Sequence, residues 1–280
     1  MPTIDAHHHV WDLTKTAYPW LDAPAWQKIK RNFDFDELRR DLVECGIQKT
    51  ILVQANNGEA DSAHAKAVAL AEDMIAGFVG WVPLLEPDKV EARLDELAVG
   101  AKLVGIRHVL GFEADNNWVL RPEVLRSLSI LEKRGLAFDL NCDHPAYLAH
   151  APTLAEKFPT LHIVVNHIGK PPIGARGWEP WASDITRAAA CPNVFAKLSG
   201  LTTPFREGWT GEDFRPYVEH AVEQFGAQRI MYASNWPVTL VAGSYRKQWD
   251  AINLALGTLS QSDTDAIYGE TAMRCYRLGS

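Results

Sequence analysis

The feature of this chain that most constrains its fold is an eightfold alternation of short apolar runs with longer segments of helical period. Each run is largely apolar along its length, which is typical of strands buried on both faces of a sheet. The predicted strands are residues 3–7, 49–55, 77–84, 103–109, 136–141, 162–167, 194–199 and 229–234. Eight such alternations in 280 residues predict an α/β fold, a single (β/α)8 TIM barrel over residues 1–280 with extended βα loops.

A doubly wound open sheet is the main alternative to a barrel. That fold usually carries a Gly-rich phosphate loop after its first strand, whereas this chain has His7, His8 and His9 there. The sequence contains no GxGxxG or GxxxxGK motif. It also has no internal repeat and no Pro/Ser-rich linker, so we expect one domain.

Composition narrows the class of protein. The net charge is −7 and no Lys/Arg-rich patch occurs, which argues against a nucleic-acid partner. No apolar run reaches about 18 residues, and the N-terminus lacks a signal-peptide pattern, so we expect no membrane association. The four cysteines are far apart and form no CxxC pair, as in proteins of a reducing compartment. We therefore expect a cytoplasmic protein, with homo-oligomerisation left open.

The end of the first predicted strand carries a pair of histidines that could act on one ligand. Side chains alternate along a strand, so His7 and His9 point one way and His8 the other. Such a pair can bind one metal ion from adjacent positions. The alternative is a histidine run with solvated rings.

Other predicted strands also end in polar residues, where a barrel places its catalytic groups. Arg107 lies inside an apolar run and needs an anionic or hydrogen-bonding partner, either a substrate or a structural ion pair across the barrel. His167 ends the sixth run before Gly169 and suits acid–base work, unless it is a core histidine satisfied by the backbone. Gln54 lies at the end of the second run and Asp143 follows the fifth, and both are candidates for substrate binding.

Two connections are longer than a barrel needs, namely residues 10–34 and 200–213. Long βα loops usually form the walls or lid of an active site. Trp11 and Trp20 lie in the first loop and Trp209 in the second. We expect these rings to stack on a substrate, although loop tryptophans also simply pack against the protein.

Taken in order along nearly the whole chain, these strand-end strings resemble the amidohydrolase superfamily, in its branch of small sugar-lactone hydrolases. The strings are IDAHHHVW at 4–11, YPWL at 18–21, GIRH at 105–108, NHIGKPP at 166–172, KLSGL at 197–201 and SNWPV at 234–238. The resemblance implies a (β/α)8 barrel that opens lactones such as fuconolactone, rhamnonolactone or related aldonic and dicarboxylic lactones.

The resemblance also implies roles for matching residues. His7 and His9 match a strand-1 pair that binds a zinc-like ion in some relatives, whereas others work without metal. His167 matches the histidine that orients or activates water, and Arg107 matches an arginine suited to substrate oxygens. Asn235 stands where the superfamily usually has an aspartate.

Asn235 weakens the expectation of a metal, because an amide is neutral and cannot act as a general base. With His7 and His9 it offsets less of the charge of a dication. His144 is a candidate for a further metal ligand. The expected cofactor is therefore one divalent, zinc-like ion or none.

The resulting hypothesis is a hydrolase in which His167 positions or deprotonates the attacking water. The carbonyl would be polarised by a metal on His7 and His9, or by these histidines as donors. Arg107, with Gln54 or Asp143, would bind substrate oxygens. Two alternatives stay open: a metal-dependent decarboxylase or other hydrolase of the same superfamily, and a non-catalytic barrel that binds a sugar acid.

Overall fold

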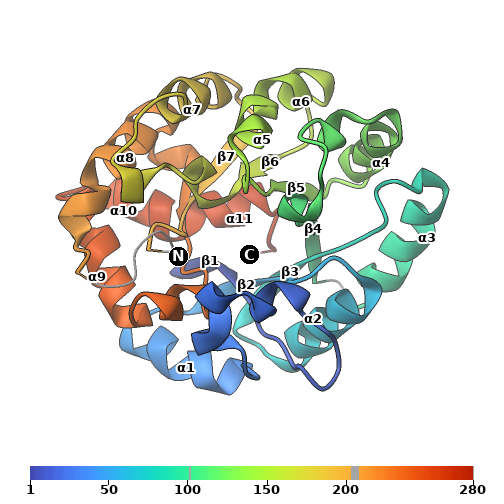
Figure 1. Cartoon of the computed structure of the whole chain (residues 1–280), viewed down its shortest axis with the longest axis horizontal. Coiled ribbons are helices and arrows are strands. Elements are labelled where there is room, and N and C mark those ends of the chain that lie inside the picture. The colour runs from blue at the N-terminus through green and yellow to red at the C-terminus, as the bar shows by residue number, and fades with distance from the viewer. Residues whose placement is uncertain (101, 203–207, 280) are drawn as a thin grey trace.

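A computed structural model places residues 1–100, 102–202 and 208–279 of the chain (Figure 1). Eight parallel strands pair in chain order, each with the next. They are β1 (Ile4–His8), β2 (Lys49–Val53), β3 (Ile75–Gly80), β4 (Leu103–His108), β5 (Ala137–Leu140), β6 (Ile163–Val165), β7 (Val194–Leu198) and β8 (Ile230–Tyr232). The barrel closes where His8 forms a parallel bridge with Trp236 and the His9 amide donates to Trp236 O at 2.7 Å. The predicted (β/α)8 barrel is confirmed.

The third strand differs from its predicted position, because it begins at Ile75 and ends at Gly80 rather than spanning 77–84. The chain leaves the sheet at Trp81, whose amide donates to Ser62 Oγ at 2.7 Å instead of to a neighbouring strand. Pro83 follows and has no amide hydrogen with which to continue the ladder. The apolar run is therefore longer than the strand.

Helices form an outer ring around the strands (Figure 1). They are α1 (Phe35–Glu44), α2 (Glu59–Ala71), α3 (Pro87–Ala98), α4 (Pro122–Lys133), α5 (Pro145–Ala149), α6 (Ala151–Lys157), α7 (Trp181–Ala189), α8 (Gly211–Phe225), α9 (Tyr245–Leu256), α10 (Gln261–Asp265) and α11 (Thr271–Cys275). Capping residues fix where several begin: the Asp34 side chain accepts from the Glu37 amide at α1, and Ser244 accepts from the Lys247 amide at α9. The helices alternate with the strands as the sequence predicts.

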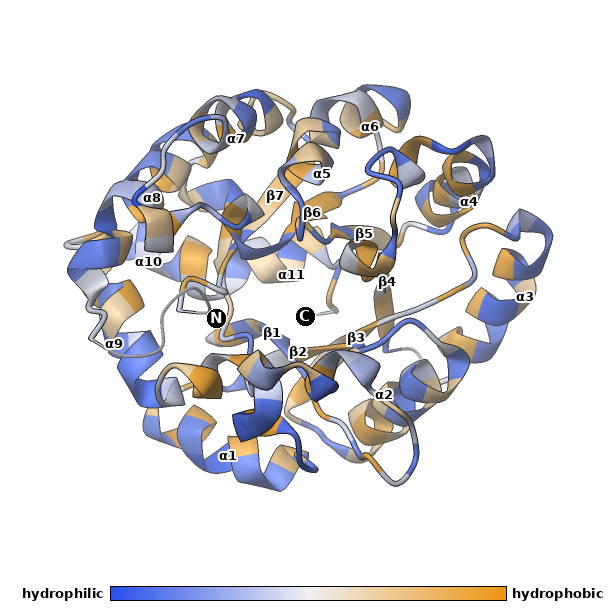
Figure 2. Cartoon of the chain, viewed as in Figure 1, coloured by the Kyte–Doolittle hydropathy of each residue, from blue (hydrophilic) through white to orange (hydrophobic). Residues whose placement is uncertain are grey.

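The apolar side chains form two layers. One lies between the strands and the helix ring and holds most of the buried aromatic residues. The other fills the barrel itself, with Ile4, Val79 and Met231 among its members. Figure 2 shows hydrophobic colour on strands such as β6 and β7, whereas β1, which carries Asp5 and the histidines, is largely hydrophilic, and hydrophilic segments are frequent on the outer helices.

The C-terminal helix α11 covers one end of the barrel. Ala272, Cys275 and Tyr276 belong to the same apolar cluster as the interior residues of the strands. His162, next to the start of β6, contacts Cys275 O through Nδ1 at 2.8 Å. Because this end is covered, substrate access is left to the opposite end, where the strands finish. Within residues 1–100, 102–202 and 208–279, no helix is long and apolar enough to cross a membrane.

Candidate active site

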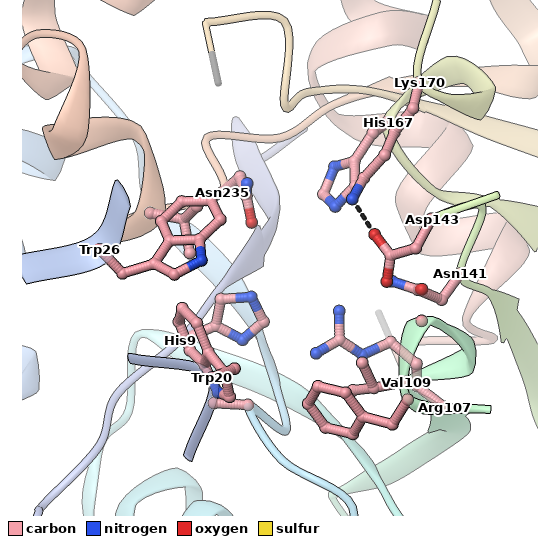
Figure 3. A pocket seen from close by; sticks show the side chains of 14 residues that line it. His9, Trp20, Trp26, Arg107, Val109, Asn141, Asp143, His167, Lys170 and Asn235 are labelled. Atoms are coloured by element: carbon pink, nitrogen blue, oxygen red, sulfur yellow. Dashed lines mark hydrogen bonds and ion pairs between the residues drawn. The ribbon is translucent and has the colours of Figure 1, made fainter. Parts of the chain in front are cut away.

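A cavity of about 300 Å³ lies at the C-terminal ends of the strands (Figure 3). Residues from the ends of six strands and from the first long loop contribute to its wall. They are His9, Trp20, Trp26, Ala55, Arg107, Val109, Gly111, Phe112, Asn141, Asp143, His167, Lys170, Asn235 and Val238. This is the position at which barrel enzymes place their catalytic groups.

A β-bulge in β1 aims the first histidine into the barrel. Ile4 and Ala6 both face the interior, so regular alternation would send His7 outward. The register between β1 and β2 instead shifts between Asp5 and His8. Asp5 holds this irregular segment, because its Oδ1 accepts from the His7 amide at 3.1 Å and from the Ser234 amide at 2.9 Å. His7 thereby joins His9 inside, and His8 points outward to Thr50.

The hydrogen-bond partners of His7 and His9 determine which ring nitrogen of each carries the proton. His9 Nδ1 lies 2.7 Å from Val53 O, which can only accept, so Nδ1 carries the proton and Nε2 carries a lone pair. Lys197 Nζ lies 3.2 Å from His7 Nδ1 and donates to it, which leaves the proton of His7 on Nε2. His7 Nε2 is 3.1 Å from His9 Nε2 and donates to it. Burial, followed in size by the charge of Lys197, lowers the pKa of His7 well below its ordinary value and keeps it neutral.

Lys197 is itself fully buried and is held by Asp139 at 2.5 Å. Asp139 also accepts from the Tyr276 hydroxyl at 2.8 Å. Burial lowers the pKa of Lys197, and the charge of Asp139 opposes that shift. The floor of the site is therefore a chain of donors that runs from Lys197 through His7 to His9.

Arg107 presents a buried guanidinium to the cavity. Its Nη2 donates to Gln54 O, the side-chain Nε2 of Gln54 donates to Arg107 O at 2.9 Å, and Arg107 Nη1 lies 3.5 Å from His7 Nε2. Its Nε has no hydrogen-bond partner among the described residues. Burial lowers the pKa of Arg107 to about 10, so the group stays protonated at neutral pH. Within the described part of the chain, Arg107 forms no salt bridge; it retains donors for a ligand.

His167 reaches the cavity from a strained segment. His167 and Ile168 have φ values of 59° and 40°, in the left-handed region, and Gly169 and Lys170 continue with 72° and 52°. His167 Nδ1 bonds to Ser199 Oγ at 2.7 Å, which leaves Nε2 as the remaining ring nitrogen. Burial, followed by the charges of Arg107 and Lys197, lowers the pKa of His167 to about 3.

Gly200 gives the His167 ring its space. A Cβ at this position would lie 2.7 Å from His167 Cγ, and the residue has φ of 66°. A side chain at position 200 is therefore excluded on both counts.

Asn235 lies across the cavity from His167 (Figure 3). Its backbone has φ of 56°, a conformation that asparagine tolerates better than most residues. Its amide donates to His7 O at 2.7 Å, so the residue is fixed beside the end of β1. The side chain is uncharged and offers one donor group and one acceptor.

The mouth of the cavity combines a charged pair with aromatic walls. Lys170 donates to Asp143 Oδ1, and both residues line the cavity (Figure 3). Asn141 lies beside them with a buried Oδ1 that has no partner among the described residues. Trp20 and Trp26, whose ring centroids lie 5.7 Å apart, come from the first long loop.

Comparison with known families matches residues 4–278 to the family described as amidohydrolase. The chain belongs to this amidohydrolase family. The predicted resemblance is confirmed over almost the entire length.

Among curated relatives of this amidohydrolase, an L-fucono-1,5-lactonase from Burkholderia ambifaria is 34% identical over 249 residues, which cover 86% of this chain and 82% of the relative. Among solved structures, an amidohydrolase from Burkholderia multivorans with bound HEPES has a TM-score of 0.91 at 30% identity, covering all of both chains. A second crystal form of that protein, with bound zinc, has a TM-score of 0.89 at 30% identity.

The donor set of this amidohydrolase does not fit a resident dication. Residues 1–100, 102–202 and 208–279 contain no group of three or more His, Cys, Asp or Glu side chains that could hold a metal ion. His7 and His9 are close enough to share an ion, but His7 Nε2 carries a proton and faces the Arg107 cation at 3.5 Å. Zinc sites in proteins have three or four protein ligands. Asn235 could add only a neutral amide oxygen to the two histidines, and it offsets none of the charge of the ion.

His144 does not join the other two predicted metal ligands. The side chain is exposed, and its Nδ1 accepts from the Ala146 amide at 3.2 Å. It thereby caps the start of α5, where His144 is the N-cap residue. The prediction that His144 lies with His7 and His9 is wrong.

Two of the three predicted stacking tryptophans do not reach the cavity. Trp11 is fully buried, its indole donates to Arg31 O at 2.6 Å, and it packs against Phe33. Trp209 is also buried and donates to Ala242 O at 2.8 Å. Both indoles donate their N–H to backbone carbonyls, and neither ring lines the cavity. Trp20 does line the cavity, and residues 203–207 of the second predicted loop lie outside the described residues.

Gln54 is likewise absent from the cavity wall and instead holds Arg107 in place. The structure brings His9, His167, Arg107, Asp143 and Asn235 together around one cavity, with His7 in the layer beneath.

Sequence reasoning did not single out several residues that build the site. Trp26 and Lys170 line the cavity, and Lys197 and Asp139 set the protons beneath it. One signal was available: a lysine in the apolar run 194–199 needs a buried partner, just as Arg107 does. Nothing in the sequence distinguishes Trp26 from Trp11.

Proposed function

We propose that this protein is a hydrolase that opens the ring of a sugar-derived lactone by attack of water on the lactone carbonyl. The observation that carries the proposal is the buried Arg107 guanidinium, with unused donors, in the same cavity as the neutral rings of His9 and His167. The similarity to an L-fucono-1,5-lactonase over most of both chains supports the same reaction class.

Arg107 supplies the electrophile. A lactone is a cyclic ester, and attack by water places a negative charge on its carbonyl oxygen. A fixed cation in a site shielded from water stabilises that charge without reorganising, which is the principle of an oxyanion hole. The hydrogen bonds between Arg107 and Gln54 hold the guanidinium in place before substrate arrives.

His167 handles the proton. The ring is neutral at physiological pH, and it acts here in the tautomer whose Nδ1–H donates to Ser199 Oγ. Nε2 then carries the lone pair, with which it orients a water and takes its proton as the new C–O bond forms. The imidazolium formed in this step then gives that proton to the ring oxygen as the C–O bond of the lactone breaks. The balance is one water consumed and one hydroxy acid formed.

Asn235 and His9 complete the set around the water. Asn235 offers an amide donor and an acceptor, and the lone pair of His9 Nε2 already accepts from His7. We assign them to positioning rather than to proton removal. Because the donor set does not fit a resident dication, no step in this proposal uses a metal.

A lactone screen tests the proposal. Aldonolactones and dicarboxylic lactones are supplied to the full chain with a pH indicator, since ring opening releases a proton, and carbon dioxide is measured in parallel. His167→Asn should lower turnover by about 10²–10⁴-fold; asparagine tolerates the left-handed backbone at this position. His144→Asn, on the exposed cap of α5, is the matched control and should be silent. Carbon dioxide release, or no opening of any lactone, would contradict the proposal.

A further inference from the structure

We propose that Asp143 and Lys170 form a subsite that reads adjacent hydroxyl groups on the lactone ring, and so selects neutral polyhydroxylated lactones over lactones that carry a carboxylate. The inference rests on the proposed function and adds a specificity role for two residues that the reaction itself does not use.

The first support is where the pair lies. Asp143 follows β5 and Lys170 follows β6, and both side chains line the cavity with His167 and Arg107 (Figure 3). Neither is fully buried: the Lys170 and Asp143 side chains are 39% and 24% exposed. A ligand in the cavity therefore meets the pair directly.

The second support is the backbone that presents Lys170. The left-handed region is sterically unfavourable for residues other than glycine, and His167, Ile168 and Lys170 all adopt it. Ile168 anchors the segment, because its side chain is fully buried and its carbonyl accepts from the Trp181 indole at 2.7 Å. The strained segment carries His167 and Lys170 to the same cavity, and such strain clusters at functional sites.

The third support is the space kept for Asp143. A Cβ at Gly111 would lie 2.8 Å from Asp143 Oδ2 and 2.9 Å from its Cβ. Gly111 does not have a positive φ, so its lack of a side chain serves this close approach and not an unusual backbone. The loop after β4 is thus shaped to leave the carboxylate where it stands.

The fourth support is the set of unused hydrogen-bonding positions. Lys170 contacts Asp143 Oδ1, which leaves two ammonium hydrogens and the other carboxylate oxygen for a ligand. Asn141 adds a buried oxygen without a partner among the described residues. Two acceptors beside one donor match hydroxyl groups, each of which can donate to a carboxylate while accepting from an ammonium.

The charges disfavour a carboxylate on the substrate. The charge of Lys170 is already balanced by Asp143, and Arg107 is committed to the carbonyl oxygen in the proposed reaction. A carboxylate next to Asp143 would meet a like charge, which is a repulsive element of the kind that produces specificity.

The test compares substrates rather than rates alone. The best aldonolactone from the screen, unsubstituted δ-valerolactone and a lactone bearing a carboxylate are assayed with Asp143→Asn, Lys170→Met and Gly111→Ala. A hydrogen bond to a charged group is worth roughly 10–200-fold. Asp143→Asn and Lys170→Met should lower kcat/KM for the aldonolactone by that factor, through KM, and leave δ-valerolactone within about twofold. Gly111→Ala should act in the same direction, since it displaces Asp143.

One result separates recognition from a structural role. Asp143→Asn should also raise kcat/KM for the carboxylated lactone several-fold relative to kcat/KM for the aldonolactone, because the substitution removes the like charge. A variant that merely loosens the loop would lower kcat/KM for all three substrates together. Asp250→Asn, in an exposed pair with Arg246, is the control and should leave the ratios unchanged.

Binding provides a readout that does not depend on turnover. Trp20 and Trp26 line the cavity, so their fluorescence should report binding of an aldonolactam, a neutral analogue of the lactone. A wild-type chain that binds the lactam, loses binding in Asp143→Asn and opens no lactone contradicts the proposed function but supports the subsite. A wild-type chain that opens lactones with ratios unchanged by either variant overturns the subsite alone. Absence of both binding and turnover overturns both.

Discussion

Two lysine–aspartate pairs lie within the same barrel and illustrate different uses of one chemical motif. Lys197 and Asp139 meet in the interior, and both side chains are completely buried. Lys170 and Asp143 meet at the mouth, and both are partly exposed. The interior pair is surrounded by protein partners, since Tyr276 bonds to Asp139 and His7 lies next to Lys197.

The difference shows how satisfaction of hydrogen bonds separates structure from recognition. The interior pair forms its further hydrogen bonds with Tyr276 and His7, and the bond from Lys197 fixes which nitrogen of His7 carries the proton. The mouth pair keeps bonding positions open and turns them toward the cavity. From this difference in bonding we predict a stability role for the interior pair and a selectivity role for the mouth pair.

The largest contrast should appear in unfolding. Lys197→Met leaves Asp139 buried without its cation, and breaking a buried pair in this way costs about 3–5 kcal/mol. Lys170→Met at the partly exposed mouth should cost less than about 1 kcal/mol. Urea denaturation of both variants measures the difference. Equal losses for the two would show that burial does not distinguish the pairs.

Arg107 is buried and lines the same cavity as the mouth pair, and its substitution tests whether this cation acts on the reaction. Arg107→Met should lower kcat/KM by about 10²–10³-fold, the usual effect of removing an oxyanion donor. Arg107→Lys should not restore activity, because an ammonium cannot reproduce the planar contacts with Gln54 and the cavity. Full activity in the lysine variant would show that Arg107 contributes only its positive charge and that the planar geometry of the guanidinium is not needed.

The pH dependence of stability tests the buried histidines. Burial lowers the pKa of His167 from 6.5 to about 3 in the folded state, so between these values the unfolded chain binds more protons. Stability is then complete above pH 6.5 and falls as the pH falls towards 3. His167→Asn should remove about 1 kcal/mol of the loss between pH 7 and 5.5. Urea denaturation of the unaltered chain and of His167→Asn at both pH values measures this loss, and the same pH dependence in both chains would refute the assignment.

The sequence predicts the barrel well because its signal is periodic and local. The eight apolar runs, and the polar residues at their ends, require no knowledge of the third dimension. The bulge that turns His7 inward is different, because it depends on Asp5 bonding to Ser234 on the far side of the closing seam. Alternation would have placed His7 with the outward residues if counting had begun at Ile4.

Residues that line the cavity are harder to predict than residues at strand ends. Trp11 and Trp20 lie in the same loop, yet only Trp20 reaches the cavity, because the indole of Trp11 is committed to Arg31 O. His144 has a side chain that could bind a metal ion, but it caps a helix instead. Such outcomes depend on which partner a side chain finds across the fold, and a single sequence does not contain that information.

The smallest expected effect is that of removing metal ions. Lys197 donates to His7 Nδ1, so the proton of His7 stands on Nε2, the atom that would have to ligate an ion together with His9. A dication would have to displace that proton while lying near Arg107, whose Nη1 is 3.5 Å from the same nitrogen. Chelation, checked by elemental analysis, should therefore change kcat/KM for the best lactone by less than about twofold. A loss of tenfold or more, restored by zinc, would mean that the interior pair releases His7 to a metal and that Lys197 controls a cofactor. In that case Lys197→Met should alter the zinc requirement, whereas Lys170→Met should not.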